Sequence, residues 1–164
     1  MSNIEVDDLS LILDLGTARR LAFLTTSRFR KLVAWWTVIY PTSYWMYRHL
    51  LVLIQYVKVT KLSNETNFSE DFQKLVLIIE VYYRNCCFVT EHFKFFANDL
   101  ADLVSCAVIF CLDMKKEFWD RYKQMSILGN EIVTSFKKCR YLYEEYQKLR
   151  FKIVSELEFL SKDQ

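Results

Sequence analysis

Apolar residues recur at intervals of four and three over most of the chain after residue 67. Such spacing places side chains on one face of an α-helix. Over residues 68–97 it predicts one long helix, which Asn67 and Glu70 can start as a capping box. The residues predicted to face the core are Phe72, Val76, Ile79, Tyr83, Cys86, Thr90, Phe93 and Ala97.

The same spacing predicts two more long helices, over residues 99–127 and 131–160. Asn98 or Asp99 can cap the first of them, and Gly129-Asn130 is typical of a helix C-terminus. The core face of the first comprises Leu100, Val104, Ala107, Cys111, Met114, Phe118 and Met125. The core face of the second comprises Ile132, Phe136, Cys139, Tyr143, Tyr146, Ile153, Leu157 and Leu160.

A second apolar stripe accompanies two of these core faces. A bundle core uses about three positions in seven of each helix, so further apolar residues form patches of the kind that mark interfaces. Alternatively, additional N-terminal helices cover the second stripes and the chain is a monomer. The second stripes comprise Leu75, Ile78, Tyr82, Val89 and Phe96, and Leu142, Leu149 and Phe159.

The N-terminal third predicts shorter helices. Residues 7–15 form a short amphipathic helix, Gly16-Thr17 is a break, and residues 18–39 form a second helix. Pro41 lacks an N–H and clashes with the preceding turn, which ends that helix. Thr42 or Ser43 then caps a helix that runs to about residue 61. The two helices meet at a corner around Trp35–Trp45, which we expect to be largely buried.

The scarcity of turn residues determines the fold class. Two glycines and one proline in 164 residues are too few for the hairpins of an antiparallel sheet. Long helices joined by short loops lie antiparallel. We predict an all-α protein: one domain over residues 1–164, an antiparallel, coiled-coil-like bundle of five to six helices, three of them about 25–30 residues long.

Neither a membrane span nor an export signal is predicted. Pro41 interrupts the apolar run over residues 32–57, and Arg48-His49 lie in the middle of the remainder. The acidic N-terminus has no basic region before its short apolar run. The five cysteines are an odd number in no framework pattern, typical of reduced, buried thiols. We expect a cytoplasmic or nuclear protein.

Enzyme chemistry finds little support in the sequence. Phosphate-binding loops need several glycines, and only Gly16 and Gly129 occur. Neither His49 nor His92 follows a Glu by three residues, as in di-iron bundles. No nucleophile signature surrounds any cysteine. We predict no catalytic residue, no metal and no cofactor.

The charge distribution indicates an interaction. Residues 15–64, the basic segment, contain no acidic residue and carry a charge of +8. The acidic parts of the chain either neutralise this segment within the bundle, or it faces an acidic partner. The candidate partner-binding residues are Arg19, Arg20, Arg28, Arg30, Lys31, Trp36 and Trp45.

The partner that these residues favour is another protein. Nucleic acid is disfavoured because the pI is about 8.2, below the values above 9 typical of such domains. We therefore expect a non-enzymatic interaction module, an adaptor or a subunit of a larger hetero- or homo-oligomer. The alternative is a peripheral protein that binds a membrane surface with the same basic segment.

Overall fold

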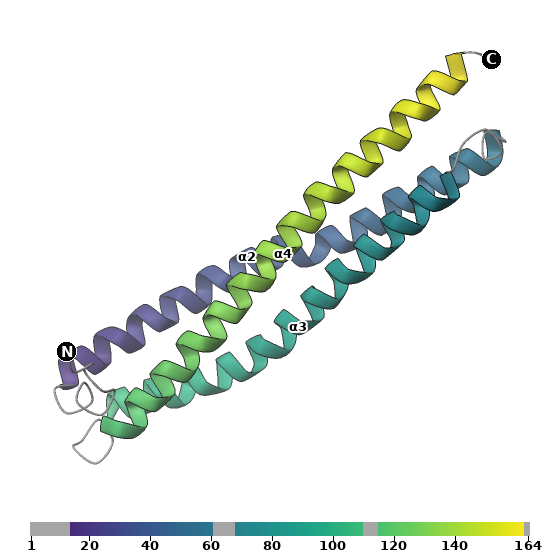
Figure 1. Ribbon diagram of the computed structural model, residues 1–164. Helices are drawn as coiled ribbons and strands as arrows, with labels where there is room; N and C mark the ends of the chain where they lie inside the picture. The colour runs from purple at the N-terminus through teal and green to yellow at the C-terminus, as the bar shows by residue number, and fades with distance from the viewer. Residues whose placement is uncertain (1–13, 61–67, 110–114, 163–164) are drawn as a thin grey trace, which may run out of the picture. The chain divides into compact units, whose positions relative to one another are not determined.

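The computed structural model describes residues 14–60, 68–109 and 115–162. They form helices α2 (Leu15–Thr60), α3 (Phe68–Val108) and α4 (Lys115–Lys162), with no strand among them (Figure 1). The all-α prediction is confirmed. The predicted number of five to six helices is wrong, because the described residues form three longer ones. Most of the predicted 7–15 helix, and the Asn67 cap, lie outside the described residues.

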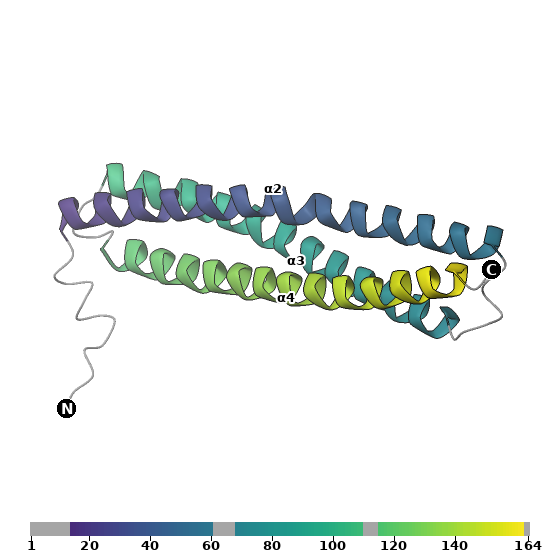
Figure 2. The same ribbon diagram turned by 90° about the horizontal axis from the view of Figure 1, so that it is seen from above.

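The predicted corner at Pro41 is absent, because α2 continues through this residue (Figure 2). A proline weakens the hydrogen bonding of the preceding turn. Here hydroxyl groups donate to three carbonyls of that turn, which supports the helix. The bonds are Thr42 Oγ1 to Val38 O (2.9 Å), Ser43 Oγ to Tyr40 O (2.8 Å) and Tyr82 Oη to Ile39 O (2.8 Å).

The burial predicted for that corner is also wrong. Trp35 is 56% exposed and Trp45 is 58% exposed. Each instead lies on the surface of a continuous helix.

The predicted boundary between residues 61 and 68 is confirmed, because α2 ends at Thr60 and α3 begins at Phe68, but the other predicted helix breaks are wrong. Asn98 and Asp99 lie inside α3, and Gly129-Asn130 lies inside α4. The change from α3 to α4 occurs between Val108 and Lys115, in the middle of a predicted helix. At the N-terminus, α2 starts at Leu15 rather than at residue 18. Asp14 caps it, because its carboxylate accepts a hydrogen bond from the Thr17 N–H at 2.7 Å, which lowers the pKa of Asp14.

The three helices contribute to two compact units. The first unit comprises residues 1–35 and 89–134, and the second comprises residues 36–88 and 135–164. Each unit therefore contains one segment of each helix. The single domain predicted over residues 1–164 stays a prediction.

In the second unit, α3 runs antiparallel to α2 and α4. Tyr82 of α3 bonds to Ile39 of α2, and Lys152 of α4 lies 3.6 Å from Asp71 near the start of α3. Tyr146 of α4 donates a hydrogen bond to the Met46 carbonyl of α2 at 3.1 Å. The core of this unit includes Met46, Leu50, Phe68, Leu75, Ile79, Cys86, Cys139, Ile153 and Leu157.

The core face of α3 is rotated from the predicted one. Leu75, Tyr82 and Val89, assigned to the second stripe, are fully buried. Val76 and Tyr83, assigned to the core, are exposed. Both stripes follow helical spacing, so periodicity alone could not decide which faces inward.

The first unit has its own apolar interior. Ala18 and Ala22 of α2 are buried, and such small side chains allow close helix contact. Phe29 stacks on the fully buried Phe96 of α3, with ring centroids 5.2 Å apart. The other buried residues of this unit include Leu32, Leu103, Phe118, Met125 and Ile132.

Candidate protein-binding site

The charge of α2 is entirely positive. Its 46 residues contain no Asp or Glu, and its basic residues are Arg19, Arg20, Arg28, Arg30, Lys31, Arg48 and Lys58. Every ion pair found between described residues joins side chains of α3 and α4 only. Within the described part of the chain, therefore, no ion pair neutralises a cation of α2.

Four of the predicted binding residues form a basic surface in the first unit. Arg19, Arg20, Arg30 and Lys31 are exposed. Arg19 and Arg30 are eleven positions apart, as are Arg20 and Lys31, so each pair returns to within about 20° around the helix. The four cations therefore lie along one side of α2, available to a partner.

Arg28, the fifth predicted cation, has a structural position. It is half-buried, and its Nη2 donates a hydrogen bond to Asn130 Oδ1 of α4 at 2.9 Å. Its guanidinium packs on the backbone of Gly129, where an added Cβ would lie 2.9 Å from Cζ. The glycine that predicted a helix end thus provides space for the arginine within a continuous helix.

The two predicted tryptophans lie in different environments of the second unit. Trp36 is half-buried and stacks on Tyr40, with ring centroids 5.1 Å apart. Trp45 is exposed and contacts Tyr44 edge-on at 5.5 Å. The guanidinium of Arg48 lies 5.8 Å from the centre of the Tyr44 ring. Trp45 is therefore the more accessible of the two indoles.

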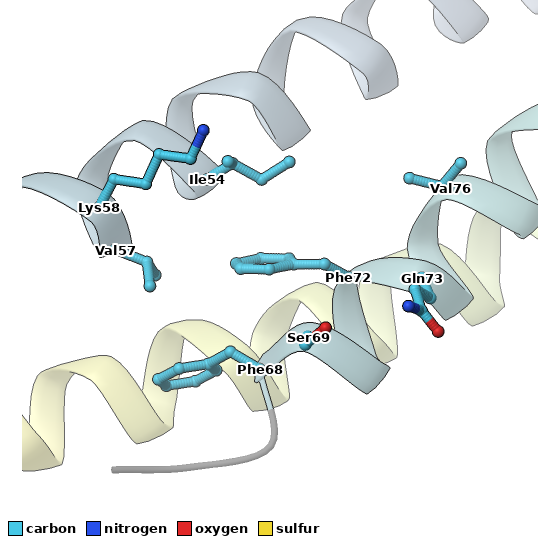
Figure 3. Close-up of a pocket in the computed structure, with 8 residues that line it drawn as sticks. All are labelled: Ile54, Val57, Lys58, Phe68, Ser69, Phe72, Gln73 and Val76. Atoms are coloured by element: carbon cyan, nitrogen blue, oxygen red, sulfur yellow. The ribbon is translucent and has the colours of Figure 1, made fainter. Parts of the chain in front are cut away.

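A groove between α2 and α3 of the second unit was not predicted. One of its two hollows has a volume of about 420 Å³. Figure 3 shows Phe72 extending from α3 toward Ile54 and Val57 of α2 within this hollow. Its main lining residues are Ile54, Val57 and Lys58 from α2, and Phe68, Phe72 and Val76 from α3.

The second hollow of this groove has a volume of about 430 Å³. Its main lining residues are Tyr40, Tyr44 and Tyr47 from α2, and Ile79, Glu80 and Tyr83 from α3. We call the two hollows together the α2/α3 groove. By contrast, the hollow between α3 and α4 has the charged border of Lys74, Glu145, Lys148 and Lys152.

One stripe of the groove went unrecognised in the sequence, because the predicted helix end at Pro41 separates its first residue from the rest. The stripe comprises Tyr40, Tyr44, Tyr47 and Leu51. Once α2 is continuous, these four residues form a stripe with intervals of four, three and four. Their exposure, from 37% to 55%, is high for large hydrophobic side chains arranged in a single row.

Two thiols meet inside the second unit. Cys86 of α3 donates a hydrogen bond to Cys139 of α4. This hydrogen bond, together with burial, raises the pKa of Cys86, whereas accepting it lowers the pKa of Cys139 in spite of burial. The Cys139 thiol also lies 3.9 Å from the Tyr82 carbonyl. A reactive thiol needs solvent access, and both side chains are buried, so this arrangement favours packing over catalysis.

Metal ligands are not assembled in the described part of the chain. No group of three or more His, Cys, Asp or Glu side chains that could hold a metal ion occurs within residues 14–60, 68–109 and 115–162. His92 instead pairs with Glu131 in the first unit, with Nε2 and Oε2 2.6 Å apart.

No protein-family model matches this chain, and no curated protein or solved structure is significantly similar to it. None of the described helices is both long enough and apolar enough to cross a bilayer. The function is therefore inferred from the charge, exposure and packing of α2 and the groove beside it.

Proposed function

We propose that this protein is a non-enzymatic protein–protein interaction module, an adaptor or a subunit of a larger complex, whose helix α2 binds an acidic partner. The observation that carries this proposal is the seven cations of α2, none of which forms an ion pair with a described residue. Positive charge gathered on one helix raises the rate of association with surfaces of opposite sign and selects against like-charged ones.

Exposed apolar area on the same helix supports a protein partner. Val38, Trp45, Val52 and Val59 recur every seven residues and are 58–70% exposed. Heptad spacing keeps them on one side of α2. Aromatic and Arg side chains carry much of the binding energy at protein interfaces, and apolar patches of this kind mark such interfaces.

A matched pair of charge reversals tests the proposal. Arg30→Glu/Lys31→Glu changes two adjacent exposed cations of α2, and Lys137→Glu/Lys138→Glu changes two adjacent exposed cations of α4. Proteins that co-purify with each tagged variant from the native cell are quantified by mass spectrometry. We expect the α2 reversal to lower the amount of a co-purified stoichiometric partner by about tenfold or more. The α4 reversal should leave that amount unchanged.

Two results would contradict the proposal. One is a wild-type chain that is recovered alone, with no stoichiometric partner. The other is a partner lost to the same extent with both reversals, because net charge rather than the α2 surface would then determine binding.

A second candidate function is binding to a membrane surface. The exposed Trp45 and Tyr44 beside Arg48 favour it, because aromatic rings and cations together suit the headgroup region. Flotation with vesicles that contain phosphatidylserine separates the two functions. An interaction module stays in the soluble fraction. A chain that floats, and that sinks after Trp45→Ala/Arg48→Ala, binds the membrane instead.

A further inference from the structure

We infer that the α2/α3 groove receives one amphipathic helix of a partner protein, with the acidic flank of that helix facing α2. This inference rests on the proposed interaction function and specifies where and how the partner binds. It concerns only the second unit, because both helix segments that line the groove belong to this unit.

The stripe on α2 has the periodicity that a helix partner requires. Its intervals of four and three residues form a seam to which the side chains of another helix can pack as knobs into holes. On the α2 side, Tyr40, Tyr44, Tyr47 and Ile54 line the hollows. The exposed Leu51 continues the same row between Tyr47 and Ile54. Such a seam normally faces another helix, and here it borders an open groove.

The α3 side of the groove provides a matching stripe. Phe72, Val76, Ile79 and Tyr83 are spaced by four, three and four residues. Val76 is 40% exposed and Tyr83 is 48% exposed. The two stripes together border a place for a fourth helix, which would complete a four-helix arrangement in this unit.

The dimensions suit a helix better than a small molecule. The hollows have nearly equal volumes, about 420 and 430 Å³, and lie one after the other along α2. The α2 side extends from Tyr40 to Lys58, about 27 Å at 1.5 Å per residue, which equals about five helical turns. Docking of an amphipathic helix through residues at i, i+3, i+4 and i+7 is a common mode of recognition.

The charges around the groove determine the chemistry of the occupant. On the α2 side, Lys58 lines one hollow and Arg48 lies beside the lining residue Tyr44. Neither cation forms an ion pair with another residue of the described ranges. Among the described residues that line the groove, the one acidic residue is Glu80 on the α3 side. An acidic flank is therefore favoured next to α2.

A second copy of this chain suits the groove less well through α2. Its own α2 has no acidic residue and would bring further cations next to Arg48 and Lys58, and like charges in contact oppose association. The favoured occupant is consequently a different chain that carries aliphatic or aromatic anchors and Asp or Glu on one flank.

A peptide selection tests this inference on the full-length protein. The library contains helical peptides of about eighteen residues. Their anchor positions are aliphatic or aromatic, and their flanks are randomised among Glu, Lys and Ser. Binding of the enriched peptides is then measured for the wild type, for Leu51→Glu and for Val76→Glu. Phe151→Glu is the control, because Phe151 lies on α4 and is 74% exposed.

We expect Glu-rich flanks among the enriched peptides, affinities at least about tenfold weaker for both groove variants, and an unchanged affinity for the control. Since Leu51 and Val76 are substantially exposed, circular dichroism should show that the variants keep their helical fold. Failure to enrich any peptide, enrichment of Lys-rich flanks, or equal weakening by the control would overturn the inference.

These outcomes are separate from those of the proposed function. A native partner that is lost with Arg30→Glu/Lys31→Glu but retained with Leu51→Glu and Val76→Glu would preserve the interaction function and eliminate the groove as its site. A partner that is retained with all of these variants would eliminate both.

Discussion

The contact between Arg28 and Gly129 leads to a sharp prediction about stability in the first unit. Adding a Cβ at position 129 would place it 2.9 Å from both Cζ and Nη1 of Arg28. The guanidinium is the far end of a flexible side chain, so Gly129→Ala should displace it rather than distort the backbone. Displacement breaks the 2.9 Å hydrogen bond from Arg28 to Asn130.

Two opposing effects determine the size of the change. Alanine is more favourable than glycine in a helix interior by about 1 kcal/mol. The lost hydrogen bond costs about 1 kcal/mol. Gly129→Ala should therefore change the free energy of unfolding of the wild type by little. In an Arg28→Ala background only the gain in helix propensity remains, and the same substitution should stabilise the protein by about 1 kcal/mol.

Urea unfolding followed by circular dichroism measures both steps of this double-mutant cycle. Gly16→Ala is the control, because an added Cβ there would meet only Asp14 Oδ1 at an ordinary 3.6 Å. Its effect should be the same in both backgrounds. If Gly129→Ala also has the same effect in both, within about 0.5 kcal/mol, Arg28 does not occupy the space above Gly129 and our assignment of its role is wrong.

Three further predictions concern the core. Phe96 is buried, and Phe96→Ala should lower the free energy of unfolding by about 3–5 kcal/mol. The neighbouring Phe95 is exposed, and Phe95→Ala should change the free energy of unfolding by less than about 0.5 kcal/mol. Equal losses in urea unfolding would contradict the assignment of Phe96 to the core face of α3. In the folded protein, iodoacetamide should alkylate the exposed Cys87 before the buried Cys139, as followed by peptide mass spectrometry. Alkylation of Cys139 first would contradict its burial. Burial raises the pKa of Tyr146, so its neutral form is favoured in the folded state. Stability should fall as the pH rises above about 10, the unfolded value, and Tyr146→Phe should reduce that fall; an unchanged pH dependence would count against the assignment.

The helical class of the fold could be predicted because periodicity and the scarcity of glycine and proline agreed. The boundary between α2 and α3 could be predicted too. The breaks at Pro41 and Gly129 could not, because contacts in the folded protein outweigh the local signals there. At Pro41, the hydroxyls of Thr42, Ser43 and Tyr82 bind the carbonyls of the preceding turn. At Gly129, the missing side chain provides space for Arg28. Thr42 and Ser43 are adjacent to Pro41 but suit a helix cap equally well, and Tyr82 and Arg28 are remote in the sequence.

The positive charge of the candidate site could be predicted from the sequence, but the α2/α3 groove could not. The absence of acidic residues over residues 15–64 is a property of the sequence, and no cation of α2 forms an ion pair with another described residue. The groove depends on which of two helical stripes of α3 faces the core. Because Leu75 and Tyr82 take the inner positions, Val76 and Tyr83 are left to line the groove. Spacing alone did not distinguish these outcomes.

The most direct test of the central claim is the mass of the native assembly that contains this chain. Native mass spectrometry of the tagged wild type, purified from its own cells, should show a complex with at least one different, acidic chain. The Arg19→Glu/Arg20→Glu/Arg30→Glu/Lys31→Glu variant should have the mass of the chain without that partner. A wild type with the mass of a single chain, or a variant that retains the full complex, would contradict the claim that α2 is an interaction helix.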